Sequence, residues 1–96
     1  IDMQMAAIAV ASGQPEQAVL LADRAIPVVQ RAENSALLAT ILLIKAQALE
    51  MMGRTAEADR LRLDSRAHAR YGFGSDAQVR AREREIAALG LRGTRG

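Results

Sequence analysis

The chain alternates between stretches in which apolar residues recur every three or four positions and short stretches rich in glycine, serine or asparagine. The first pattern indicates amphipathic helices, and the second indicates the turns between them. The alternation of Val, Thr and aromatic residues that is typical of strands does not appear. We therefore predict an all-α protein with helices over residues 3–12, 15–29, 36–52, 55–70 and 77–89.

Local signals mark the ends of these helices. Pro15 stands in the first turn of the second helix, where its missing N–H costs nothing. Asn34 or Ser35 is expected to cap the third helix, and Gly53 fits the left-handed position that closes it. Pro27 lies inside the second helix and predicts a bend there, because a proline removes one backbone hydrogen bond.

The helices differ in how much of their surface is apolar. The third helix, ALLATILLIKAQALEMM, is apolar nearly all round over its first half, which predicts neighbours on several sides. The fifth helix carries Val79, Ile86 and Leu89 on one side and charged residues on the other. After it, we expect residues 91–96 to form a disordered tail.

The chain contains an internal repeat. Superposing Gly13 on Gly53 aligns residues 12–18 with residues 52–58. Each segment follows an apolar helix and opens a helix rich in small residues. A helix–turn–helix unit that recurs with a period of about 40 residues is typical of an α-solenoid.

The repeated pattern resembles the tetratricopeptide repeat over residues 3–70. The residues that carry the resemblance are Gly13 and Gly53, the alanines five positions on (Ala18 and Ala58), and the small residues seven positions further (Ala25 and Ser65). The period is longer than the ~34 residues of the standard repeat, and long-period forms look like the sensor arms of bacterial signalling and transcription regulators. The resemblance implies a short right-handed α-solenoid. Two antiparallel helical hairpins, 3–32 and 36–70, would be followed by a capping helix at 75–90.

In this family the first helix of each unit lines the concave face. Carried over by position, that face comprises Met3, Ala7, Val10, Ala11, Thr40, Leu43, Gln47, Glu50 and Met51. The residues that we expect to bind protein are Met3, Ala7, Val10, Leu43, Gln47, Glu50 and Met51. A trough this apolar needs cover in water. Three occupants are open: the fifth helix folding back, a second copy in a homodimer, or an amphipathic helix of a partner.

The composition argues against catalysis and against a bound cofactor or metal. One histidine, His68, and no cysteine cannot make a recognisable metal site. Glu83 and Glu85 stand two positions apart, so they do not face one another on a helix. The segment around Gly72 and Gly74 is too short for a phosphate-binding loop. We expect neither an enzyme nor a small-molecule substrate, and the charged residues within 36–52 argue against a membrane span.

The C-terminal part of the chain is basic. From Arg54 onward ten arginines face six acids, against three bases and five acids before it. Interleaved pairs such as Arg80–Glu83 and Arg82–Glu85 favour a solvated face over nucleic-acid binding. The two aromatic residues, Tyr71 and Phe73, are expected to anchor the fourth and fifth helices to the core.

Together these observations predict a non-catalytic protein–protein interaction or oligomerisation module. Because the sequence starts with Ile1, we expect a fragment of a larger bacterial protein, and we place it in the cytoplasm. The alternative is a helical regulatory arm of a transcription or signalling regulator. Its basic C-terminal face would contact nucleic acid.

Overall fold

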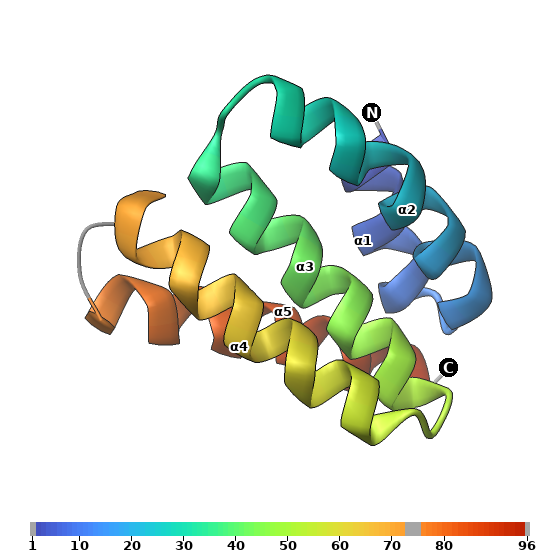
Figure 1. The fold of residues 1–96 in the computed structure, drawn as a ribbon. Helices are drawn as coiled ribbons and strands as arrows, with labels where there is room; N and C mark the ends of the chain where they lie inside the picture. Colours follow the sequence, from blue (N-terminus) through green and yellow to red (C-terminus); the bar gives the residue numbers. More distant parts are fainter. Residues whose placement is uncertain (1, 73–75, 96) are drawn as a thin grey trace.

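The computed structural model describes residues 2–72 and 76–95, and these form five α-helices. The helices are α1 (Asp2–Ala11), α2 (Pro15–Arg31), α3 (Ser35–Met51), α4 (Thr55–Gly72) and α5 (Asp76–Arg95). Figure 1 shows α2, α3 and α4 side by side in chain order, with α5 crossing behind α3 and α4. The prediction of an all-α fold is confirmed.

The predicted helix starts agree with the structure to within one residue, whereas the ends differ more. Helix α2 continues through Pro27 to Arg31, past the last residue of its apolar stripe. Helix α5 runs to Arg95, through Gly90, although the sequence analysis expected the helix to end at Leu89 and a tail to follow. A glycine lowers helix stability by about 1 kcal/mol relative to alanine without forbidding the helix, which is why it marked the end wrongly here.

The two turns that carry the repeat have the same backbone geometry. Gly13 and Gly53 both adopt a left-handed conformation, with φ of 74° and 82°. Each glycine N–H donates to the carbonyl three residues earlier, at 3.1 and 3.0 Å. The N–H of the following residue donates to the carbonyl five residues earlier, at 2.8 and 2.9 Å. This hydrogen-bond pattern closes a helix that ends on a left-handed residue, so the sequence repeat is a structural equivalence.

Small residues hold each hairpin together. Ala18 and Ala58, which follow the two turns, are both fully buried. Seven positions on, Ala25 and Ser65 are buried as well, and the Ser65 hydroxyl donates to the carbonyl oxygen of Ala39 on α3 at 2.8 Å. A side chain as short as these lets two helix backbones approach closely. Successive helices therefore pack in an antiparallel manner along the chain.

Helix α3 is the centre of the molecule. It packs against α2, α4, α5 and α1, and its buried residues lie on every side of the helix. The prediction that this helix is enclosed is confirmed. Its start is capped by Asn34, whose side-chain oxygen accepts a hydrogen bond from the Leu37 N–H at 3.1 Å.

After α4 the chain turns back, and α5 crosses α3 and α1. It packs mainly on α1 and α3 and only slightly on α4. The radius of gyration is 12.1 Å, close to the ~12.5 Å expected for a compact domain of this length. Among the helices that the structure describes, none combines the length and the apolar character needed to cross a membrane.

Candidate functional site

The face expected to bind a partner lies where α1 and α3 pack side by side. Val10 on α1 and Leu43 on α3 are buried in the main hydrophobic cluster. Met3, Ala7 and Met51 are half-buried at the edge of the same cluster. Five of the seven predicted residues therefore come together as one surface of core side chains, which we call the α1/α3 face.

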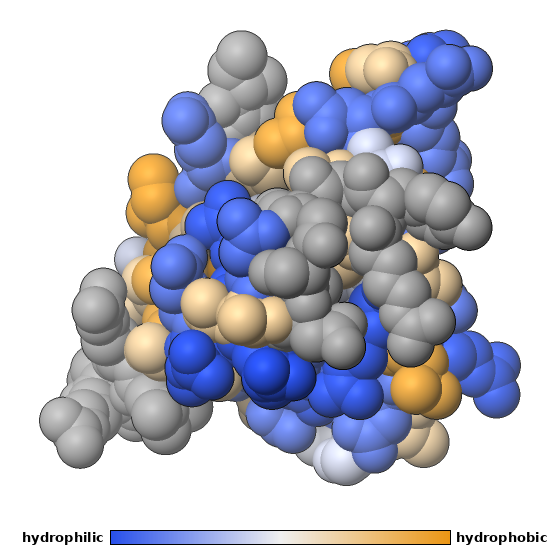
Figure 2. All heavy atoms as spheres, turned by 90° about the vertical axis from the view of Figure 1, so that its left-hand side faces the viewer, coloured by the Kyte–Doolittle hydropathy of each residue, from blue (hydrophilic) through white to orange (hydrophobic). Residues whose placement is uncertain are grey.

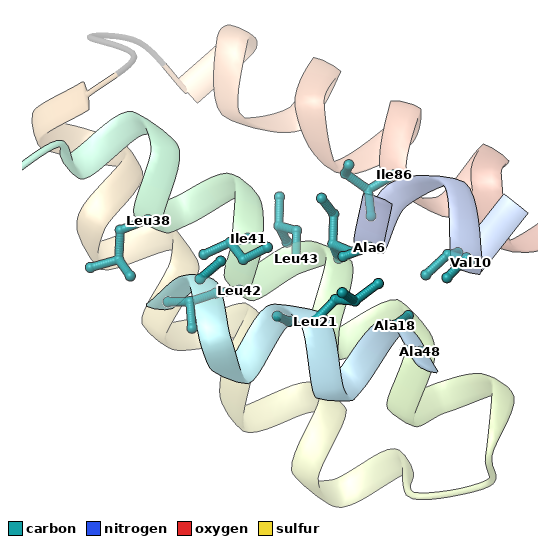
Figure 3. Close-up of a cluster of buried hydrophobic side chains, with 14 residues drawn as sticks. Ala6, Val10, Ala18, Leu21, Leu38, Ile41, Leu42, Leu43, Ala48 and Ile86 are labelled. Atoms are coloured by element: carbon teal, nitrogen blue, oxygen red, sulfur yellow. The ribbon is translucent and has the colours of Figure 1, made fainter. Parts of the chain in front are cut away.

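Helix α5 covers the α1/α3 face. Ile86 is only 6% exposed and belongs to the same cluster as Leu43, and Leu89 packs against that cluster. Figure 3 shows Ile86 directed from α5 toward α1 and α3. The side chain of Val79, the third residue expected on this side, lies outside the described residues. Of the three occupants that the sequence left open, the structure places the fifth helix on this face.

This cover, the first of the three expected occupants, closes the α1/α3 face. While α5 is in place, Val10 and Leu43 have almost no surface left for another protein, with exposed fractions of 0% and 4%. The sequence contained the apolar stripe of α5 but not its destination. A stripe only requires burial somewhere, and its spacing does not encode which surface of the fold provides that burial.

Gln47 and Glu50, the two polar residues of the expected protein-binding set, point elsewhere. Arg62 on α4 donates to both carboxylate oxygens of Glu50, at 3.2 and 3.1 Å. The same guanidinium approaches the Gln47 side-chain oxygen at 3.5 Å and the Asp59 carboxylate at 3.4 Å. These side chains therefore join α3 to α4. Sequence reasoning missed Arg62, because an interhelical ion pair leaves no fixed spacing along the chain.

A cleft remains between α1, α3 and α5. It has a volume of about 450 Å³, and its walls are mostly apolar. Ile44 and Ala7 contribute to its lining, and Thr40 also lines it. The Thr40 hydroxyl is satisfied by donating to the backbone carbonyl of Ala36 at 2.9 Å. Arg82 and Glu85, paired at 2.9 Å, stand at its side on α5. An apolar side chain fits such a lining better than a charged substrate does.

Ion pairs lie along α4 and α5. The Arg66 guanidinium donates to both oxygens of Glu83 on α5, at 3.0 and 3.2 Å. These hydrogen bonds, together with the negative charge of Glu83, raise the pKa of Arg66 above its usual value. Arg82 and Glu85 pair as the sequence predicted, whereas Glu83 reaches across to α4. On the face seen in Figure 2, hydrophilic residues predominate and hydrophobic ones form small separate groups.

The candidate catalytic and metal-binding residues are dispersed. His68 is half-buried on α4, and Asp64 is exposed on the same helix. Asp59 is engaged with Arg62. Within residues 2–72 and 76–95, no group of three or more metal-binding side chains comes together.

Among the described residues, six large apolar side chains outside the predicted set are exposed to solvent: Met5, Ile8, Leu20, Val28, Leu37 and Leu63. Met5 and Ile8 on α1 are 50% and 63% exposed, and Leu63 on α4 is 65% exposed. Met5 and Ile8 were not expected from the sequence because the all-round apolar criterion was applied only to the third helix. The same criterion applied to residues 3–11 points to Met5 and Ile8.

Comparison with known proteins adds no relative. The chain matches no protein-family model, and no curated protein and no solved structure shows a significant match to it.

Proposed function

We propose that this chain is a non-catalytic protein-association module built from two tetratricopeptide-like hairpins. Its α1/α3 face is a docking site for one amphipathic helix, and α5 is the occupant carried by the chain itself. The observation that supports this proposal most strongly is the burial of Ile86 of α5 against the α1/α3 face. A helix held in a groove through a few apolar side chains is a recurring mode of protein recognition.

The tetratricopeptide-like assignment is supported by the repeated turns. Gly13 and Gly53 share the same left-handed conformation and hydrogen-bond pattern, and the small residues that follow are buried alike. We propose that the two hairpins stack as in a short right-handed α-solenoid, with α5 turned back over the concave side. Stacked repeats need such a cap, because an end hairpin exposes surface that another repeat would bury.

A role without catalysis is supported by the state of the charged residues. Glu50, Glu83 and Glu85 each pair with an arginine, and the cleft beside α5 is mostly apolar. The same pairing reduces the positive charge that a nucleic-acid surface would need, so we do not favour the alternative. The cytoplasmic setting and the bacterial origin remain predictions from the sequence.

The docking role is tested by loosening α5 and supplying it from outside. Ile86→Asp places a charge in the apolar contact and is expected to release α5. A synthetic peptide of residues 76–95 should then bind the variant with a micromolar dissociation constant, measured by calorimetry, and should not bind the native chain, whose site is filled. Ala87→Asp is the matched control, because Ala87 is the next residue on α5 and is exposed.

The control variant should behave as the native chain does. Circular dichroism must show that α1–α4 stay helical in Ile86→Asp. If the folded variant fails to bind the peptide, the α1/α3 face is only an interior surface and the proposal is wrong.

A further inference from the structure

The equivalence of the two turns makes α1 the counterpart of α3, but the two helices are covered differently. Ala48 on α3 lies in the main cluster together with residues of α2 and is completely buried. Its counterpart one repeat earlier is Ile8, which is 63% exposed. The face through which α3 meets the preceding hairpin is therefore repeated on α1, where solvent takes the place of a helix.

The joint between the two hairpins shows which residues meet across such a face. Lys45 of α3 and Asp23 of α2 form an ion pair at 2.6 Å. The counterpart of Lys45 one repeat earlier is Met5, and the counterpart of Asp23 one repeat later is Leu63. Both counterparts are large and apolar, and both are at least half exposed. The two surfaces that meet between α2 and α3 therefore each have a counterpart, one on α4 and one on α1. In these counterparts the apolar residues Leu63 and Met5 replace the charged residues Asp23 and Lys45.

We propose that a second copy of this chain stacks on the first from head to tail, so that α4 of one copy packs on α1 of the next. In this arrangement Leu63 meets Met5 in the register in which Asp23 meets Lys45 within the chain. Ile8 is covered by the same helix, as α2 covers Ala48. The contact joins two different surfaces and is therefore heterologous, which allows further copies to add.

The rest of the α4 surface is compatible with this contact. Asp59 and Arg66, which flank Leu63, are already paired with Arg62 and with Glu83 of α5. Asp59 and Arg66 can keep these partners when two copies stack, and burying the pairs has a desolvation cost that the apolar contact of Leu63, Met5 and Ile8 has to offset. Leu63 is exposed with α5 in place, so stacking does not require α5 to move. The inference thus concerns a surface separate from the α1/α3 face.

The stacking is tested by sedimentation equilibrium of the full chain from micromolar to millimolar concentration. The average mass of the native chain should rise steadily with concentration. Met5→Lys and Leu63→Asp each place one charge against an apolar side chain of the neighbouring copy. Each variant should remain monomeric where the native chain is half associated, with a dissociation constant raised by about tenfold or more.

The most informative variant reproduces the Lys45–Asp23 ion pair at the contact between two copies. A chain carrying both Met5→Lys and Leu63→Asp presents the residues of the Lys45–Asp23 pair at the two ends, so its association should return. An equimolar mixture of the two single variants should also associate, because every junction in it can be matched. Val28→Asp is the control, since Val28 is exposed on α2 and α2 makes no contact with α4 in the described residues.

Three outcomes overturn the inference. The first is a native chain that stays monomeric up to millimolar concentration. The second is loss of association in Met5→Lys but not in Leu63→Asp, which indicates an α1–α1 contact. The third is a double variant that stays monomeric although circular dichroism shows it folded. None of these results bears on the peptide experiment with Ile86→Asp, so the two proposals fail separately.

Discussion

Helices α1 and α3 are similar in sequence character and opposite in surroundings. Both carry apolar residues on nearly every side. Helix α3 has its whole circumference in contact with neighbours, whereas α1 presents Met5 and Ile8 to solvent. The difference shows that the apolar pattern of a helix sets how much surface it needs to bury, while its position in the fold decides which of its faces contact a neighbour.

The largest expected difference in unfolding free energy comes from placing the same charge at equivalent positions of α1 and α3. Ala48→Asp buries an unpaired carboxylate where Ala48 is fully enclosed and should lower the free energy of unfolding by about 3 kcal/mol or more. Ile8→Asp adds the same group at an exposed site and should change it by less than about 0.5 kcal/mol. Urea denaturation followed by circular dichroism measures both values.

Equal losses of unfolding free energy in Ala48→Asp and Ile8→Asp would contradict the difference between α1 and α3. In that case α1 is covered in solution as completely as α3. The measurement must be made at a protein concentration below the onset of association, so that a neighbouring copy does not cover Ile8.

An intermediate effect is expected at the two turns. Gly13→Ala and Gly53→Ala each force a side chain into the left-handed region, which costs about 1–2 kcal/mol. A Cβ at Gly53 meets no atom within 4 Å, so backbone strain is the entire penalty there. The two variants should lose the same stability within about 0.5 kcal/mol. A clearly smaller loss at Gly13 means that the first turn relaxes and that the hairpins are not equivalent.

The smallest expected effect on stability comes from a charge difference between the same two turns. Arg54 and Glu57 form a hydrogen-bonded ion pair at 2.7 Å in the second turn, where the first turn has Gln14 and Gln17. The hydrogen bond from Arg54 lowers the pKa of Glu57. Arg54→Ala should return that pKa to its ordinary range, which NMR titration of the Glu57 carboxyl carbon detects.

The sign of the matching pH effect follows from the same shift. A carboxylate with a lowered pKa in the folded state stabilises the fold above its unfolded pKa, and this contribution is lost as the pH falls through the folded value. Because both side chains are exposed, the contribution is slight. An unchanged Glu57 titration in Arg54→Ala contradicts the assignment of this pair.

The elements whose causes are local could be predicted from the sequence. The positions of Pro15, Asn34 and Gly53 placed the helix starts and the turn correctly, because caps and left-handed residues act within one helical turn. The enclosure of α3 was also readable, since its apolar residues left no face for water. The repeat of Gly13 at Gly53 predicted the equivalence of the two turns.

The side-chain contacts between helices could not be predicted as well from the sequence. Gln47 and Glu50 were expected in a trough, and Arg62 draws both toward α4. A small rotation of a helix decides which neighbour such a polar residue meets, and no spacing in the sequence encodes it. The expected anchors Tyr71 and Phe73 lie outside the residues whose side chains the structure describes, so their role stays a prediction.

Part of the contact between α3 and α4 is made by side chains with little or nothing beyond Cβ. Ala39 meets Ala69, Ala46 lies in one cluster with Ala58, and Ser65 bonds to the backbone of α3. Side chains this short let the two helix backbones approach closely. The chain can therefore exchange its solvent-facing side chains while the angle between the two helices remains the same.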